Sequence, residues 1–167
     1  ATTREYFADI GLAGEGEAAA VPLPRPLLGS AEPHFSFAGL KSAVLRAKQS
    51  GDFADADIAA AFQQAAIDCI IDRTRRALDA SGEVTALVVA GGVAANREIR
   101  AALEKLAEDN GLPFVAPPLP LCTDNAAMIA WAGIERLGQN DPLDFVARPR
   151  WPLDLSAEPV RGAGVKA

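Results

Sequence analysis

Residues 84–97 read VTALVVAGGVAANR, and this stretch decides the fold. Its first half, residues 84–90, is a near-continuous apolar run rich in β-branched side chains, which is typical of a strand buried on both faces of a parallel sheet. Gly91 and Gly92 end the run, and residues 94–110 follow with a helical pattern. The stretch therefore predicts a strand, a glycine turn and a helix in direct succession.

The same alternation continues downstream. Residues 114–116 are expected to form a second short strand before a proline-rich loop, and residues 123–137 have a helical pattern that stops at Gly138. Strand, helix, strand and helix at this spacing predict βαβ units with a right-handed crossover. We therefore expect an α/β fold.

Two helices are expected upstream of this unit. Residues 39–49 gather apolar side chains on one face, and residues 55–80 carry a longer apolar stripe, with Asp55 or Asp57 able to cap the second helix. The stripe consists of Ile58, Phe62, Ala65, Ala66 and Cys69.

Three further segments are expected to lie outside the helices. Residues 21–29 are rich in proline and indicate a loop, because proline lacks a backbone donor and favours extended neighbours. Residues 34–37 indicate a short strand. The tail, residues 141–167, is expected to be an irregular extension.

Composition limits the class of protein. The 167 residues include 16 basic and 22 acidic side chains, which gives a net charge of −6, and 50% of the residues are hydrophobic. This balance fits one domain with a sizeable core and excludes a wholly disordered chain. The acidic charge argues against affinity dominated by nucleic-acid phosphates but leaves a local basic patch open.

Cysteine spacing and segment hydropathy bear on location. Cys69 and Cys122 are far apart and form no CxxC pair, which excludes a disulfide scaffold and a cysteine-rich zinc site. Residues 1–20 lack the apolar segment of a signal peptide, and no stretch has the length and hydropathy of a membrane span. We expect a cytoplasmic protein with no membrane contact.

The glycine turn is the first candidate site. Glycine lets a ligand approach the backbone closely, and a helix start offers unpaired N–H donors to a phosphate. Asn96, in the first helical turn, can point its amide into the same space. The alternative is that Gly91 and Gly92 only permit tight packing of strand against helix, and the pattern alone leaves both interpretations open.

The second candidate site is the junction at residues 121–130, LCTDNAAMIA. Thr123 or Asp124 can cap the helix that follows, and this structural role is the simpler interpretation. The functional interpretation makes Asp124 a metal ligand, although one aspartate cannot build a metal site alone. Cys122 lies at the same junction and could be exposed, but no histidine partner is recognisable, so a nucleophilic role is not favoured.

Four segments together resemble one known family. They are FSFAGLKSAV, VVAGGVAANREIR, CTDNAAMIAWAG and ARPRWPLD. In this order and spacing they resemble the tRNA N6-adenosine threonylcarbamoyltransferases of the bacterial TsaD type, formerly described as O-sialoglycoprotein endopeptidases. The resemblance covers roughly residues 22–154.

The resemblance implies one lobe of an actin-like ATPase fold, related to ribonuclease H, with a mixed sheet flanked by helices. It implies transfer of a threonylcarbamoyl group from its adenylate to N6 of adenosine 37 of tRNA. The implied cofactor is one divalent metal ion, iron or zinc, and the implied nucleotide is ATP or threonylcarbamoyl-adenylate. The implied partners are tRNA, a homologous non-catalytic subunit and a small ATPase.

Residue by residue, Asn96 matches the family's substrate-binding asparagine and Asp124 its metal-binding aspartate. Gly91 and Gly92 match the glycines that line the nucleotide pocket. No catalytic residue is assigned, because little in the chain looks like a general base and positioning would supply much of the catalysis.

The departures from the family pattern indicate a C-terminal part of such an enzyme. The family takes two further metal ligands from an HxxxH pair, which His34, the single histidine, cannot supply. We therefore expect residues 1–20 to match poorly, residues 21–140 to form the lobe, and the isolated chain to be inactive. A non-catalytic nucleotide-binding or partner-binding paralogue or fragment is the alternative. An exposed apolar patch is expected where a second lobe would pack.

Overall fold

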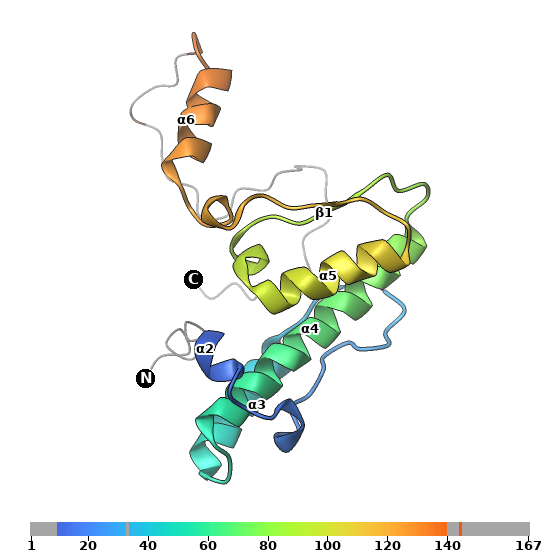
Figure 1. The fold of residues 1–167 in the computed structure, drawn as a ribbon, viewed down its shortest axis with the longest axis vertical. Coiled ribbons are helices and arrows are strands. Elements are labelled where there is room, and N and C mark those ends of the chain that lie inside the picture. Colours follow the sequence, from blue (N-terminus) through green and yellow to red (C-terminus); the bar gives the residue numbers. More distant parts are fainter. Residues whose placement is uncertain (1–9, 33, 140–143, 145–167) are drawn as a thin grey trace. The chain divides into compact units, whose positions relative to one another are not determined.

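The computed structural model describes residues 10–32, 34–139 and 144. The chain divides into two compact units, Ala1–Ile129 and Ala130–Ala167, and the fold described below is that of the first. Figure 1 shows the elements in chain order. They are α2 (Ile10–Ala13), η1 (Ala18–Ala20), α3 (Ala38–Ser50), α4 (Asp55–Ala80), β1 (Leu87–Val88), η2 (Gly92–Ala95), α5 (Arg97–Asp109), β2 (Phe114–Val115), η3 (Leu119–Leu121) and α6 (Ala126–Glu135).

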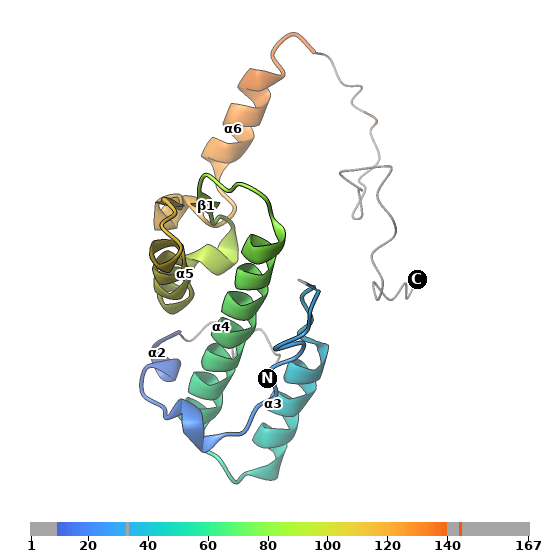
Figure 2. The same cartoon turned by 90° about the vertical axis from the view of Figure 1, so that its right-hand side faces the viewer.

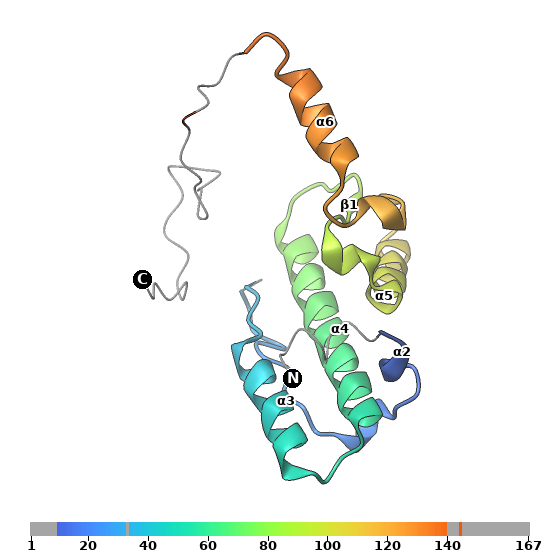
Figure 3. The ribbon, with the colours of Figure 1, turned by 90° about the vertical axis from the view of Figure 1, so that its left-hand side faces the viewer.

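Helix α4 is the central element of this unit. It contacts α3 and α5, which lie on opposite sides of it (Figure 2 and Figure 3). The short α2 and η1 also contact α4. The expected bounds of α4 are confirmed, and Gly51 ends α3 at a φ of 74°, a conformation that favours glycine.

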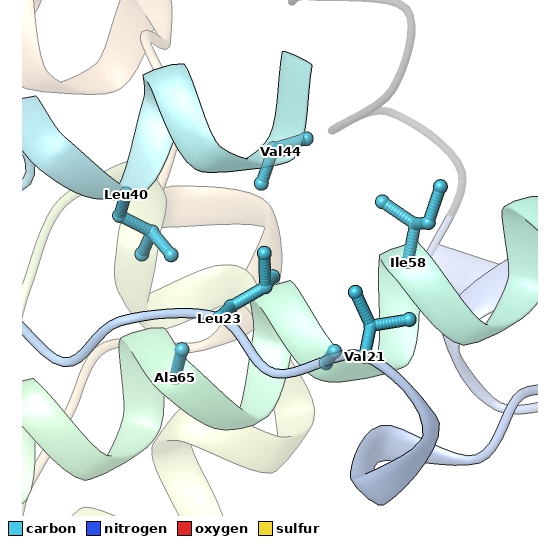
Figure 4. Packing of buried hydrophobic residues seen from close by; sticks show 7 residues of the cluster. Val21, Leu23, Leu40, Val44, Ile58 and Ala65 are labelled. Atoms are coloured by element: carbon cyan, nitrogen blue, oxygen red, sulfur yellow. The ribbon is translucent and has the colours of Figure 1, made fainter. Parts of the chain in front are cut away.

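One core cluster joins α3, α4 and the proline-rich segment ahead of them. Figure 4 shows its side chains pointing toward one another. The cluster consists of Val21, Leu23, Leu40, Val44, Ile58, Ala61 and Ala65. Burying a valine, leucine or isoleucine side chain contributes about 1.5–3 kcal/mol, so this cluster holds the proline-rich segment against both helices.

A second core cluster holds α5 in place. Ile99, Leu103 and Leu106 are spaced by three or four residues and form the buried face of α5. They pack against isoleucines of α4 and against Leu87 and Phe114 of the two strands. The βαβ unit therefore rests on α4 through apolar contacts.

The two strands pair in parallel, as expected from the sequence. Leu87 is opposite Phe114 and Val88 is opposite Val115 in the register. The expected strand at 84–90 is reduced to Leu87–Val88, and the parallel pair is the only sheet among the described residues. Val88 is 66% exposed, so this strand is not buried on both faces. The longer strand and the mixed sheet that were expected depend on such burial.

Loop 21–32 is bound to α4 by ion pairs and hydrogen bonds. Arg25 forms an ion pair with Asp68 at 2.9 Å, and the Gly29 N–H donates to Asp72 at 3.2 Å. Arg73 is 1% exposed, pairs with Asp72, and donates through Nη1 to the carbonyl oxygens of Ser30 at 3.0 Å and Glu32 at 2.7 Å. This loop is thus anchored by charged groups as well as by its apolar residues.

These contacts also change the acidity of two side chains. The hydrogen bond from Arg73 lowers the pKa of Asp72 below its ordinary value of 3.8. Burial, together with the nearby Asp68 carboxylate, raises the pKa of the Cys69 thiol. Cys69 is 2% exposed and belongs to the interior, as the apolar stripe predicts.

Several local expectations are wrong. Residues 34–37 form no strand, since Phe35 and Phe37 are exposed and have no partner strand among the described residues. Ala54, with no side-chain bond, is the N-cap of α4, because Asp55 pairs with Lys48 and Asp57 accepts from the Glu17 N–H.

Two helix boundaries also differ from those expected. Asn96 is extended, with a ψ of 120°, so the helix expected at 94–110 divides into η2 and α5. Helix α6 begins at Ala126 rather than at Thr123, because the Asn125 side chain accepts the Met128 N–H at 2.9 Å and caps it.

Helix α6 carries exposed apolar side chains. Ile129, Trp131 and Ile134 are each more than 60% exposed. No helix in the described part of the chain is long and apolar enough to cross a membrane. The expected irregular tail lies outside the described residues apart from residue 144, and so does the segment ARPRWPLD.

Candidate functional site

A cleft of about 730 Å³ opens where β1 leads into η2. We call it the glycine cleft. One wall is the glycine turn, and the other is the segment from Pro117 to the first turn of α6. Its lining consists of Ala90, Gly91, Gly92, Pro117, Leu121, Cys122, Thr123, Asp124, Asn125, Ala127 and Met128. The structure therefore brings together three of the four site residues expected from the sequence: Gly91, Gly92 and Asp124.

The two glycines serve the cleft in different ways. Gly91 has a φ of 84° and a ψ of 179°, a conformation essentially restricted to glycine, and its carbonyl oxygen accepts the Ala94 N–H at 3.0 Å. Gly92 has no such requirement. A Cβ atom built at either position meets no atom within 4 Å. Tight packing of strand against helix therefore does not account for either glycine.

Asn96 is the expected site residue that does not line the cleft. Its Oδ1 accepts the Ile99 N–H at 3.0 Å and caps α5. Its Nδ2 donates to Oε1 of Gln63 on α4, also at 3.0 Å. Both polar ends of the side chain are thus occupied, and the second hydrogen on Nδ2 is the donor left for a ligand.

Sequence reasoning did not identify Gln63. The residue lies on α4, 33 positions before Asn96, and it is half-buried where α4 faces the start of α5. A glutamine on the partly buried side of an otherwise apolar helix face is the signal that could have drawn attention to it, because buried amides are usually hydrogen-bonded.

Asp124 lies at the mouth of the glycine cleft with an exposed side chain. The capping interpretation is wrong for this residue, because Asn125 caps α6. Among the described residues no group of three histidine, cysteine, aspartate or glutamate side chains could hold a metal ion. Asp124 therefore fits one ligand of a metal, not a complete site.

Cys122 is buried, not exposed, and Arg100 contacts it. Arg100 on α5 donates from Nη2 to Cys122 Sγ at 3.2 Å and to the Pro117 carbonyl oxygen at 2.8 Å. Its Nε donates to the Ala94 carbonyl oxygen at 3.1 Å. The thiol faces the interior at 2% exposure, so no nucleophilic role arises from this geometry.

Comparisons with known proteins agree on one family. A family model described as tRNA N6-adenosine threonylcarbamoyltransferase matches residues 6–131. A protein of that name from Erythrobacter litoralis is 75% identical over 158 residues, which cover 93% of this chain and 46% of that protein. One from Novosphingobium aromaticivorans is 73% identical over 159 residues, 93% of this chain and 45% of that protein. The chain thus spans slightly less than half the length of these curated relatives.

Proposed function

The chain belongs to the tRNA N6-adenosine threonylcarbamoyltransferase family, and on that premise we propose that it forms the C-terminal lobe of a tRNA-modifying acyltransferase. In the proposed reaction, N6 of adenosine 37 attacks the carbonyl carbon of threonylcarbamoyl-adenylate. The bond from that carbon to the phosphate oxygen breaks, AMP leaves, and the amine gives up a proton. The sequence relationship to the named transferases supports this chemistry.

The glycine cleft is the observation that carries the proposal. In open α/β folds, nucleotides bind beyond the carboxyl ends of parallel strands. The cleft occupies that position after β1, and the start of α6 contributes Ala127 and Met128 to its wall. Asn125 accepts the Met128 N–H, and the first N–H groups of α6, which a helix leaves without an internal partner, suit the phosphate of an adenylate.

The side chains around the cleft would bind and orient the adenylate. Gly91 and Gly92 leave the backbone open to close approach. Asn96 does not line the cleft, but it keeps one amide hydrogen for a ligand. Little in this lobe looks like a general base, so its proposed contribution is to hold the reacting carbon in place.

Asp124 supplies one carboxylate toward the divalent metal that the family implies. Iron or zinc bound there would polarise the reacting carbonyl as a Lewis acid. The described residues do not complete such a site, and for this reason we propose that the isolated chain is inactive in transfer.

The wider assignments belong to the same proposal. The substrate partner is tRNA, and the protein partners are a homologous non-catalytic subunit and a small ATPase. The whole protein has the actin-like fold, with residues 1–20 as the segment ahead of the lobe, residues 21–140 as the lobe and residues 141–167 as an extension. The proposed location is the cytoplasm.

Calorimetric titration of the chain with ATP tests the cleft. Gly92→Leu would place a side chain in the open space beside the glycine turn, and we expect it to abolish ATP binding. Gly82→Leu is the matched control, because a Cβ atom there also meets nothing within 4 Å and Gly82 does not line the cleft. Equal ATP affinity in the wild type and Gly92→Leu would refute the assignment of the cleft.

The transfer reaction needs a separate measurement. Incubating the chain with threonylcarbamoyl-adenylate and unmodified tRNA, followed by mass spectrometry of the nucleosides, should detect no threonylcarbamoyladenosine. Modification by the isolated chain would contradict its proposed inactivity. ATP binding without any modification, even when the chain is joined to the N-terminal half of a relative, would instead favour a non-catalytic nucleotide-binding module.

A further inference from the structure

Arg100 connects the two walls of the glycine cleft. Its Nε donates to the carbonyl oxygen of Ala94, two residues after Gly92. Its Nη2 donates to the carbonyl oxygen of Pro117 and to Sγ of Cys122 on the opposite wall. One side chain therefore holds three points on two segments that line or adjoin the cleft.

These three Arg100 contacts, which we call the Arg100 bridge, lie just beyond the end of the two-stranded sheet. The last backbone hydrogen bond between the two walls in the described part of the chain runs from the Val89 N–H to the Val115 carbonyl oxygen at 2.9 Å. Beyond it, the glycine turn and the loop after β2 have no backbone ladder to fix their separation. The Arg100 contacts begin immediately past that point, so they set the spacing that the ladder no longer sets.

The guanidinium group suits this task better than other side chains. Its planar fork sends N–H donors in several fixed directions, and here the donors reach three acceptors on two walls. Lysine has one compact ammonium group and cannot match those directions. Ala94 and Cys122 are buried at 0% and 2% exposure, so water cannot readily replace the donors.

From this geometry we propose that Arg100 is a positioning residue, which holds the glycine turn and the 117–122 segment at the separation that ligand binding requires. Arg100 does not line the cleft. It acts through two lining residues, the Pro117 carbonyl and the Cys122 thiol, and through Ala94, which follows the glycine turn. The link to a nucleotide rests on the proposed function, whereas the bridge itself rests on the three contacts.

The two cysteines provide a test in the full chain. Cys122 reports on the bridge, while Cys69 lies on α4 against the Pro26 carbonyl oxygen and does not contact Arg100. Both are buried, so global unfolding exposes both. Alkylation by iodoacetamide under native conditions, followed site by site with mass spectrometry, separates local opening of the cleft from loss of the whole fold.

Arg100→Gln should raise the alkylation rate of Cys122 by about tenfold, as expected for the loss of roughly one hydrogen bond from a charged donor. The Cys69 rate should stay unchanged. Arg97→Gln is the matched control, because Arg97 is exposed on the same helix and loses the same charge. Arg100→Lys should give an intermediate Cys122 rate, and it carries the comparison if Arg100→Gln does not fold.

An equal rise at both cysteines would overturn the proposal, because Arg100 would then support only global stability. No rise at Cys122, or full protection in Arg100→Lys, would overturn the bridging role as well. Titration with ATP tests the effect on the ligand: Arg100→Gln should weaken affinity about tenfold by the same reasoning, and Arg97→Gln should not.

The two hypotheses fail in distinguishable ways. If the wild-type chain does not bind ATP, the proposed function fails, and the Cys122 rates alone decide the bridge. If Arg100→Gln opens Cys122 but keeps wild-type ATP affinity, the positioning role is refuted while the proposed function stands.

Discussion

Replacing the buried Arg73 with methionine should loosen loop 21–32 and lower the stability of the whole unit. Arg73 is 1% exposed, and its Nη1 donates to two carbonyl oxygens of that loop. Methionine keeps much of the length of the side chain but removes the charge and every donor. The Arg73→Met variant therefore leaves the loop carbonyl groups without their partners.

The expected size of the effect follows from the contacts. Each hydrogen bond from a charged donor contributes about 1.5–3 kcal/mol, while a buried polar atom without a partner costs about 1–3 kcal/mol. Arg73 Nε is such an atom among the described residues, so its removal offsets part of the loss. The Asp72 side chain is 20% exposed and can regain water. We expect a net loss of about 2–3 kcal/mol.

Thermal unfolding followed by circular dichroism measures this loss. For a chain of this size, 1 kcal/mol corresponds to a shift of about 3 °C in Tm, so Arg73→Met should unfold about 6–9 °C earlier. Hydrogen exchange should also accelerate in residues 26–32. Arg75→Met is the matched control, because Arg75 is exposed on the same helix.

A specific outcome would refute this reasoning. If Arg73→Met and Arg75→Met have the same Tm and the same exchange in residues 26–32, the buried cation does not anchor the loop. A lower Tm with unchanged exchange in the loop would place the effect in packing of α4 instead.

Three further predictions concern the pH response, the glycine turn and α5. Arg73 lowers the folded-state pKa of Asp72 below 3.8. The ionised carboxylate therefore contributes stability above pH 3.8, and this stability is lost as the pH falls through the folded-state pKa. Below pH 3.8, the Tm of Asp72→Asn should fall less steeply with decreasing pH than the Tm of the wild type. Gly91→Ala should lower the free energy of unfolding by about 1–3 kcal/mol because Gly91 has a φ of 84°, whereas Gly92→Ala should change it by less than about 0.5 kcal/mol. Equal losses for the two variants in urea unfolding would contradict this prediction. Leu103→Ala should lower the free energy of unfolding by about 2–5 kcal/mol in the same assay, because Leu103 is 4% exposed within the cluster under α5. A smaller loss would mean that neighbouring side chains move in to fill the space of the removed atoms.

Local patterns were sufficient to predict the four longest helices and their order, although not the short α2 and the 3-10 turns. The bounds of α4 agree with the apolar periodicity of residues 55–80, and Gly51 and Gly111 end helices in conformations that glycine adopts readily. The parallel pairing of residues 87–88 with 114–115 also agrees with the strand–helix–strand pattern. The helix bounds depend on residues within a few positions of one another, whereas the strand pairing follows from the order of strand, helix and strand along the chain.

Strand lengths and helix caps were predicted less well. The apolar run at 84–90 forms only two ladder residues, because a strand is as long as its partner allows and the paired β2 is also short. Asn125 rather than Thr123 or Asp124 caps α6. When neighbouring residues have similar capping preferences, the sequence does not tell which of them caps the helix, because the choice depends on where the chain turns.

The sequence by itself determined the order of the main elements, the glycine turn and the four segments that resemble the family. It also placed Gly91, Gly92 and Asp124 among the site residues, and all three line one cleft. Only the tertiary structure decided that Asn96 is held by Gln63 and that Arg100 joins the two cleft walls. The physical reason is that helix and turn patterns arise between near neighbours in sequence, whereas these hydrogen bonds form only after distant segments have packed together.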